Sequence, residues 1–330
     1  MHTSWNEAEI ASLHEKLAAL RASMGQVIVG QKDVIESLLI CLISGSHALL
    51  EGVPGLGKTL LVKSLAQATD LQFRRVQFTP DLMPSDIVGT EILEEDLTTR
   101  QRVFRFQAGP VFTQVLLADE INRAPPKTQS ALLEAMQERS VTFAGQTHRL
   151  PNPFFVLATQ NPIEQAGTYP LPEAQLDRFL LRIDVGYPTE AEEIDMVART
   201  THAGLAEATP AMDVTSLLRL QTLVRETEIG DHLLRYATRL IRATRPQDSA
   251  VERVRKQVAW GAGPRAGQAL VLAAKARACL YGRLAVTRED IAAMLLPVLA
   301  HRVLRNFEAE ADGVAIADIL QAITAQIHIE

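Results

Sequence analysis

Residues 51–59 read Glu-Gly-Val-Pro-Gly-Leu-Gly-Lys-Thr and contain the pattern Gly-x-x-x-x-Gly-Lys-Thr. An apolar run, His47–Leu50, comes before the pattern, and a helical pattern of apolar residues begins at Leu60. A strand, a glycine loop and a helix N-terminus suit phosphate binding, because glycines let the backbone turn its N–H groups inward and the helix end adds partial positive charge. The stretch therefore predicts a P-loop that binds a nucleotide.

The residues of the loop have separate expected roles. Lys58 is expected to reach the β- and γ-phosphates and to take part in catalysis, and Thr59 is expected to ligate Mg²⁺. The predicted nucleotide-binding residues of the loop are Gly52, Val53, Pro54, Gly55, Leu56, Gly57, Lys58, Thr59 and Leu60. The alternative is a glycine-rich turn that only caps a helix, and the apolar strand before the loop argues against it.

Composition limits the class of protein. The chain has 330 residues, which suggests two domains, and its 47% apolar and 22% charged residues are typical of an ordinary soluble protein. The net charge of −6 argues against a general nucleic-acid binder. Cys41 and Cys279 stand in apolar helical surroundings, and we interpret them as buried, reduced thiols of a cytoplasmic protein. No signal peptide is evident, and the apolar runs are too short to span a bilayer.

Two acids follow a second apolar run. Val115–Glu120 reads Val-Leu-Leu-Ala-Asp-Glu, which suits a buried parallel strand with both acids at its carboxyl end. Ligands of open α/β sheets bind at that edge. Asp119 is expected to bind the nucleotide's Mg²⁺ through water, and Glu120 to act as the base that orients the attacking water. The alternative is a strand followed by an acidic helix cap.

Two further polar residues follow predicted buried elements. Asn161 ends the apolar strand 154–162 and is expected beside Asp119, where it could bind a γ-phosphate or the attacking water. Its alternative role is that of a turn-forming residue before proline. Arg178 ends a short helix and is expected near the same carboxyl edge, where it could enter a neighbouring subunit's nucleotide site. Its alternative is an ion pair with Asp177 or Glu173.

From Pro188 onward the periodicity is helical. Arg265 follows a proline that opens one of these helices, so it is expected to point toward a phosphate, the alternative being a solvated surface arginine. Asp231 and Thr287 are expected as N-caps. Two hairpins are expected before this region, one inserted at 87–107 and one at 141–150, and the first could be an ordinary surface hairpin without a role.

Taken in order, these motifs resemble the MoxR family of AAA+ ATPases, in the clade with a helix-2 insert. The stretches that carry the resemblance are Gly52–Thr59, Phe78–Leu82, Leu117–Gln129, Ala158–Pro162, Arg178 and Gly263–Ala266. The resemblance implies an α/β fold, with a three-layer αβα P-loop core and parallel sheet over residues 1–188. It also implies a smaller all-helical lid over residues 189–330. Residues 84–108 would be the helix-2 insert and residues 140–151 the pre-sensor hairpin.

The same resemblance implies the function. Mg²⁺ and ATP or ADP would be the ligands, and ATP the substrate of hydrolysis. Arg178 would be the arginine finger, and Arg265 a second sensor in its own or a neighbour's site. A homo-oligomeric ring, a hexamer, would remodel or mature a client complex, for example by metal or cofactor insertion, together with a von Willebrand factor A domain protein. Neither nucleic acid nor direct membrane insertion is expected.

Two other classes of function compete with this interpretation. A nucleic-acid motor is one, because related insert-bearing ATPases include helicases, although the acidic composition argues against it. A nucleotide-gated binding scaffold with little turnover is the other, and the presence of Glu120 and Arg178 argues against it. The identity of the client cannot be read from the chain.

Overall fold

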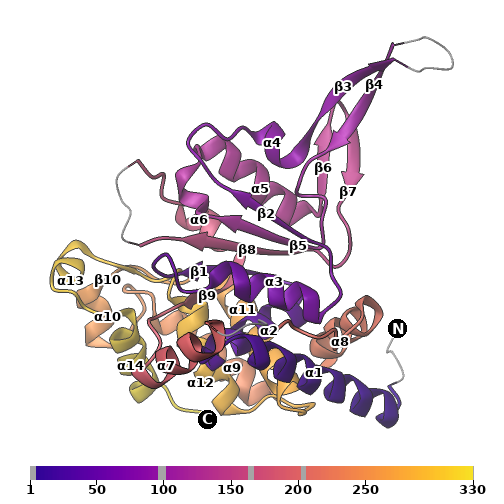
Figure 1. Cartoon of the computed structure of the whole chain (residues 1–330). Helices are drawn as coiled ribbons and strands as arrows, with labels where there is room; N and C mark the ends of the chain where they lie inside the picture. Colours follow the sequence, from indigo (N-terminus) through magenta and orange to yellow (C-terminus); the bar gives the residue numbers. More distant parts are fainter. Residues whose placement is uncertain (1–4, 96–101, 163–166, 202–205, 330) are drawn as a thin grey trace.

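The structure, a computed structural model, describes residues 5–95, 102–162, 167–201 and 206–329. A five-stranded sheet crosses its centre (Figure 1). In spatial order the strands are β2 (Phe73–Gln77), β5 (Val115–Asp119), β8 (Phe155–Gln160), β1 (His47–Glu51) and β9 (Phe179–Asp184). Neighbouring strands are parallel throughout, so all carboxyl ends lie at one edge of the sheet and all amino ends at the other. We call these the carboxyl edge and the amino edge.

The inner strands β5, β8 and β1 are buried along nearly their whole length, which is the pattern of a parallel sheet covered by helices on both sides. Because successive side chains of a strand point to opposite faces, adjacent residues enter different cores. Val115 and Leu117 join one buried cluster, whereas Leu116 and Ala118 join the other.

Helices cover both faces of the sheet (Figure 1). On one face lie α1 (Glu7–Val27), α2 (Lys32–Ile43) and α3 (Lys58–Ala68). On the other lie α4 (Pro84–Val88) and α5 (Pro126–Glu138). The three layers confirm the predicted α/β fold.

The C-terminal region is mainly helical, as expected. Its helices are α7 (Glu190–Thr200), α8 (Val214–Glu226), α9 (Asp231–Ala243), α10 (Glu252–Gln257), α11 (Pro264–Leu280), α12 (Arg288–Leu299), α13 (Phe307–Ala311) and α14 (Ile316–Gln326). It also contains a small antiparallel pair, β10 (Val258–Trp260) and β11 (Leu304–Arg305). No helix within the described ranges is long and apolar enough to cross a membrane.

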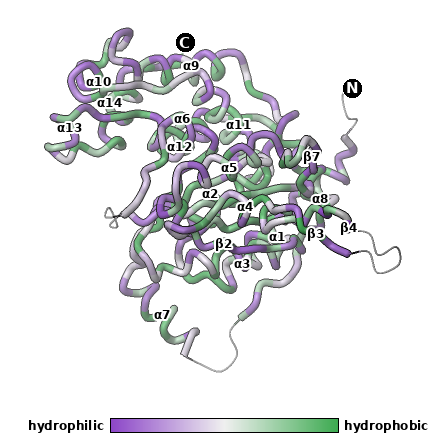
Figure 2. The backbone as a smooth tube through the Cα atoms, turned by 90° about the horizontal axis from the view of Figure 1, so that it is seen from above, coloured by the Kyte–Doolittle hydropathy of each residue, from purple (hydrophilic) through white to green (hydrophobic). Residues whose placement is uncertain are grey.

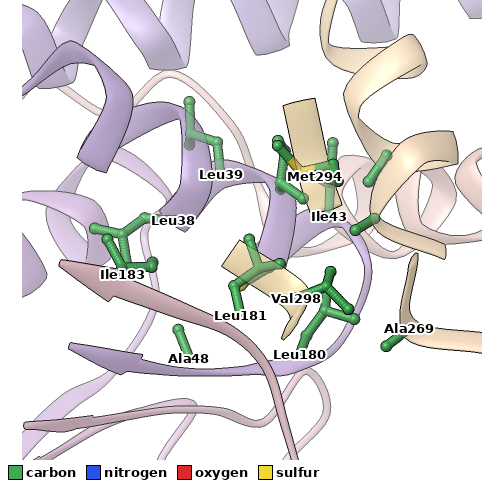
Figure 3. Packing of buried hydrophobic residues seen from close by; sticks show 14 of the residues in the cluster. Leu38, Leu39, Ile43, Ala48, Leu180, Leu181, Ile183, Ala269, Met294 and Val298 are labelled. Carbon is green, nitrogen blue, oxygen red and sulfur yellow. The ribbon is translucent and has the colours of Figure 1, made fainter. Parts of the chain in front are cut away.

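The N-terminal helices share a core with the C-terminal ones. α2 packs against α8 and α11, and α12 packs against β9. Figure 3 shows buried side chains of this shared core, which come from α2, β9 and α12: Leu38, Leu39, Leu181, Met294 and Val298. The division into residues 1–188 and 189–330 stays a prediction, and the packing joins the two parts across it.

Two hairpins project on the side of α4 and α5 (Figure 1). The first pairs β3 (Gly89–Glu95) with β4 (Arg102–Ala108), and the expected turn residues 96–101 lie outside the described residues. The hairpin begins at Gly89 and not at 84, because Pro84 opens α4. The second pairs β6 (Ser140–Phe143) with β7 (Gln146–Arg149). The imidazole of His148 stacks on Phe106 with ring centroids 4.1 Å apart, so the two hairpins support each other.

Candidate active site

The glycine loop lies at the carboxyl edge, between the last residue of β1 and the first residue of α3. Gly55 and Gly57 have φ angles of +87° and +74°, a region that side chains other than glycine rarely adopt. A Cβ at either position would meet no atom within 4 Å, so these glycines serve the backbone turn and leave the loop open outward. Gly52 differs, because a Cβ there would lie 2.6 Å from the Val185 carbonyl.

Lys58 is held within the loop. Its ammonium donates a hydrogen bond to the Gly52 carbonyl at 2.6 Å. Partial burial lowers the pKa of Lys58, and the negative charges of Asp119 and Glu120 oppose that shift. The lysine therefore lies in the electric field of both acids, which the sequence predicted for a shared site.

Asp119 ends β5, is largely buried and has a different partner for each carboxylate oxygen. The Thr159 hydroxyl donates to Oδ1 at 2.6 Å. Arg75 of β2 donates to Oδ2 through Nε at 3.1 Å and Nη2 at 2.6 Å. Neither partner was predicted from the sequence. The alternation of residues 73–77 was the available signal for Arg75, because it places Arg75 and Gln77 on one face of the strand.

Glu120 is fixed in an unusual backbone conformation. Its φ of 56° and ψ of 51° are left-handed, and it immediately precedes the short 3-10 helix η1 (Ile121–Arg123). Its N–H donates to Thr159 Oγ1 at 2.8 Å, and its carboxylate accepts from Gln77 Nε2 at 2.7 Å and from Arg123 Nη1 at 2.9 Å. Such a conformation costs about 1 kcal/mol and persists because surrounding bonds impose it. The residue is therefore fixed by three neighbouring elements: β8 bonds its backbone, and β2 and η1 orient its carboxylate.

The donor set suits a magnesium nucleotide. Thr59 follows Lys58 in the first turn of α3, and Asp119 ends β5 at the same carboxyl edge. Mg²⁺ prefers oxygen ligands, and a hydroxyl with a carboxylate supplies them. Asp119 is compensated by the Arg75 guanidinium, and a divalent cation would offer the same compensation. The open glycine loop beside them leaves room for phosphates.

Asn161 lies where the sequence placed it. It directly follows β8, which pairs with β5, and it is buried. The fold therefore brings Lys58, Thr59, Asp119, Glu120 and Asn161 to one edge of the sheet, from three neighbouring strands.

Arg178 does not lie at that edge, and the expectation for its position was wrong. It immediately precedes β9, whose first residue, Phe179, pairs with His47 at the start of β1. Arg178 is thus at the amino edge, about 16 Å of strand away from the P-loop end of β1. The short helix α6 (Glu173–Leu176) brings the chain back from the carboxyl edge before the next parallel strand begins. The Arg178 guanidinium donates to the Leu133 carbonyl of α5.

Arg265 lies near Arg178. It occupies the first turn of α11, and its Nη1 is 3.8 Å from Oδ2 of Asp177. Asp177 also accepts a bond of 2.7 Å from Arg302 Nε, which fixes this corner to the C-terminal helices. Of the predicted site residues, Arg178 and Arg265 are therefore grouped at the amino edge, opposite the P-loop, Asp119, Glu120 and Asn161.

Comparison with known proteins identifies the family of the chain. Residues 47–181 match the family described as "ATPase family associated with various cellular activities (AAA)", and residues 250–323 match the AAA lid domain. The chain is 43% identical to Chaperone MoxR1 of Mycobacterium tuberculosis over 98% of its length and 83% of that protein's. It is 34% identical to Protein MoxR of Paracoccus denitrificans, over 90% of this chain and 91% of that protein.

A solved structure is similar throughout. The crystal structure of a putative ATPase from Cytophaga hutchinsonii has a TM-score of 0.91 and 41% identity, and the match covers 98% of both chains. The identity and coverage of these relatives show the family as well as the fold. The chain is an ATPase, and it belongs to the MoxR family of AAA proteins.

Proposed function

We propose that this chain is a chaperone-like ATPase whose hydrolytic sites are completed between neighbouring copies in a ring. The observation that carries the proposal is the position of Arg178. Arg178 and Arg265 lie at the amino edge, while the P-loop and the acid pair lie at the carboxyl edge. Neither arginine can reach the phosphates of its own chain across a five-residue strand, so each serves the site of an adjacent copy.

Within one site, the roles follow the chemistry of each group. The P-loop backbone from Gly52 to Gly57 and the helix N-terminus at Leu60 bind the phosphates, and the Lys58 ammonium contacts the terminal ones. Thr59 and Asp119 would hold Mg²⁺, which would neutralise phosphate charge when bound. Glu120 accepts the proton of the attacking water, and Asn161 orients that water.

The neighbouring copy provides the remaining charge. Its Arg178 stabilises the charge that develops on the transferring phosphate, and its Arg265 contacts the same phosphates. In the resting geometry Arg178 is bonded to the Leu133 carbonyl, so it must leave α5 to act. Turnover is in this way linked to the position of a neighbour.

The biological role extends the same proposal. A ring of six copies in the cytoplasm would use hydrolysis to move the lid and the two hairpins against a client protein complex. Maturation of that complex, including metal or cofactor insertion, and a von Willebrand factor A domain partner are parts of the proposal that rest on the family resemblance. The relative from Mycobacterium tuberculosis is itself named a chaperone.

Mixing two inactive variants tests the shared site. Lys58→Ala should lose nucleotide binding, while Arg178→Ala should bind nucleotide but lose at least about 10³-fold in turnover. An equimolar mixture should recover about a quarter of wild-type activity, because one contact in four joins an intact P-loop with an intact Arg178. Phosphate release measures the activity.

Each result of the mixing experiment is decisive. Recovered activity supports completion of the site between copies. No recovery, despite proof by sedimentation that the two variants assemble together, would refute it. Normal hydrolysis by Arg178→Ala alone would show that the arginine has no role in the site.

A further inference from the structure

α7 is an amphipathic helix with its apolar face turned outward. Ile194 and Val197 lie on that face and are 64% and 55% exposed, and Ala191 and Ala198 continue it at helical spacing. No residue of the helix is buried. An apolar stripe normally faces a core, so an outward stripe indicates a surface that another molecule covers.

The opposite, charged face of α7 contacts the protein. A Cβ on Gly30 would lie 2.5 Å from the Glu192 carboxylate. Asp195 and Arg199, which pair at 2.8 Å, line a cavity of about 450 Å³ together with Arg21 and Lys32. The charged side chains of α7 therefore face its own chain, while Ile194 and Val197 stay largely exposed.

This helix flanks the P-loop half of the site. Gln31 Nε2 donates to the Leu56 carbonyl of the loop at 3.3 Å, and Gly30 beside it carries the Glu192 contact. β9 leads from the sheet to α7, and Val185 at its end packs on Gly52. The outward stripe of Ala191, Ile194, Val197 and Ala198, which we call the α7 patch, is thus next to the carboxyl edge.

A second apolar patch flanks the arginine half. Trp260 is 67% exposed and Phe307 is 88% exposed, and we call this pair the aromatic corner. Trp260 of β10 pairs with Leu304 of β11, three residues before Phe307. Arg302, two residues before Leu304, donates to Asp177, and Arg265 follows Trp260 by five positions. The aromatic corner is therefore attached to the residues that hold the amino edge.

The two patches lie on separate elements, and the charges around them are opposite. Figure 2 shows α7 near the lower edge of the view, apart from α10 and α13 at the upper left. α7 contains the acids Glu190, Glu192, Glu193 and Asp195 and the single base Arg199. α10, which leads into Trp260, contains the bases Arg253, Arg255 and Lys256 and the single acid Glu252. The α7 patch is thus surrounded by acidic side chains, and the aromatic corner lies next to a basic helix.

We propose that the aromatic corner of one copy docks on the α7 patch of the next copy of this chain. The contact is heterologous, because each copy uses a different patch on each side. It rests on the shared site proposed above, and it would bring the corner that carries Arg265 to the helix that flanks a neighbour's P-loop. Trp260 and Phe307 are the anchors, since aromatic side chains dominate such contacts.

Sedimentation velocity with Mg-ADP tests the contact with two double variants. Ile194→Asp/Val197→Asp removes the α7 patch, and Trp260→Ser/Phe307→Ser removes the aromatic corner. Each should self-associate at least about tenfold more weakly than wild type. Phe104→Ser, which removes an exposed aromatic from β4, is the matched control and should assemble as wild type does. Circular dichroism verifies that each variant is folded.

A mixture of the two double variants gives the sharper result. One intact α7 patch and one intact aromatic corner remain per pair, so the mixture should form heterodimers that grow no further. A mixture that stays monomeric, or double variants that assemble like wild type, would overturn the docking. In those cases the shared site still stands if the Lys58 and Arg178 variants complement each other. A wild-type chain that hydrolyses ATP as a monomer would overturn both.

Discussion

Asp119 is a buried carboxylate that the fold already neutralises with Arg75. The guanidinium comes from the neighbouring strand and donates to one carboxylate oxygen, while the Thr159 hydroxyl donates to the other. Gln77, two positions along the same face of β2, bonds Glu120. β2 therefore positions both acids of the site, although it contributes no residue that was predicted to act on the nucleotide.

Substitution of Arg75 should separate this role from catalysis. Arg75→Met keeps an unbranched stem and removes the guanidinium with its donors, so we expect the free energy of unfolding without Mg²⁺ to fall by about 2 kcal/mol. Mg-ADP should reduce the difference in stability between Arg75→Met and wild type, because a cation near Asp119 replaces the lost positive charge. Urea unfolding with and without Mg-ADP measures both values.

Arg74→Met is the matched control, because Arg74 is the adjacent arginine on the opposite face of β2. It should change stability little. Equal losses in the two variants, or a loss that Mg-ADP leaves unchanged, would show that Arg75 does not compensate Asp119.

Site residues that belong to a short local motif could be predicted from the sequence. Lys58 and Thr59 belong to one short motif, and Asp119 and Glu120 end one apolar run. The partners of these residues depend on the strand order, which places β2 next to β5. Residues 180–185 were expected as a strand, and a residue that directly precedes a parallel strand lies at its amino edge. The position of Arg178 could therefore have been predicted from the sequence, and the expectation missed it.

β1 is anchored at its first residue by a buried imidazole. His47 Nδ1 accepts a bond from the Val156 N–H at 3.0 Å, and Nε2 lies 3.4 Å from the Met136 carbonyl. One side chain thus connects β1, β8 and α5 at the amino edge. Burial lowers the pKa of His47 to about 4, so the ring is neutral in the folded chain.

Because His47 is buried and neutral, we expect the folded protein to lose stability in acid. The unfolded chain takes up a proton below a pKa of about 6.5, whereas the folded chain does so only near 4, so stability is lost as the pH falls between these values. From pH 7 to pH 5, His47 should lower the free energy of unfolding by about 2 kcal/mol. His301, whose pKa burial also lowers, acts in the same direction.

Urea unfolding at the two pH values tests the anchor. His47→Gln keeps one donor and one acceptor but does not titrate, so its loss of stability between pH 7 and pH 5 should be smaller than that of wild type. An unchanged pH dependence in His47→Gln would assign the effect to other groups.

Elements with a clear period were predicted well, and short ones were not. The helix expected at 214–226 is α8 with the same bounds, and Thr287 caps α12 with Asp290 as expected. Ile87 and Val88 look β-prone but belong to α4, because the preceding proline suits a helix start. Asp231 is the first residue of α9 and Gly230 is its cap. β10 and β11 are too short to show any period.

At the scale of the whole molecule, the N-terminal helices and the lid form one packed body beside the sheet. The packing of α2 against α8 and α11, and of α1 against α11, was not predicted from the sequence. Amphipathic patterns show that a face is buried but do not identify what buries it. The three layers were predicted from the resemblance to a family of known fold, and not from the amphipathic patterns alone.

The opposite charges of the two docking surfaces predict a salt effect. Turnover per chain should rise with protein concentration, and the concentration needed should increase several-fold between about 0.05 M and about 0.5 M salt, because screening weakens the attraction of α7 for α10. Phosphate release across a dilution series measures this. Salt also screens the binding of the nucleotide phosphates. The nucleotide affinity of the Trp260→Ser/Phe307→Ser variant, measured at both salt concentrations, gives the size of that effect without the docking contact. Turnover per chain that is independent of concentration would contradict the prediction.

The separation of Arg178 from its own P-loop determines how many complete sites a group of copies can form. In an open row of copies, the last P-loop has no arginine and the first arginine has no P-loop, so a row of any length always leaves one site unfinished. Closure of the row is the only arrangement that completes every site. If sites are shared as proposed, closing the row would raise the activity of every chain in it, and one inactive copy in a ring would remove two sites at once.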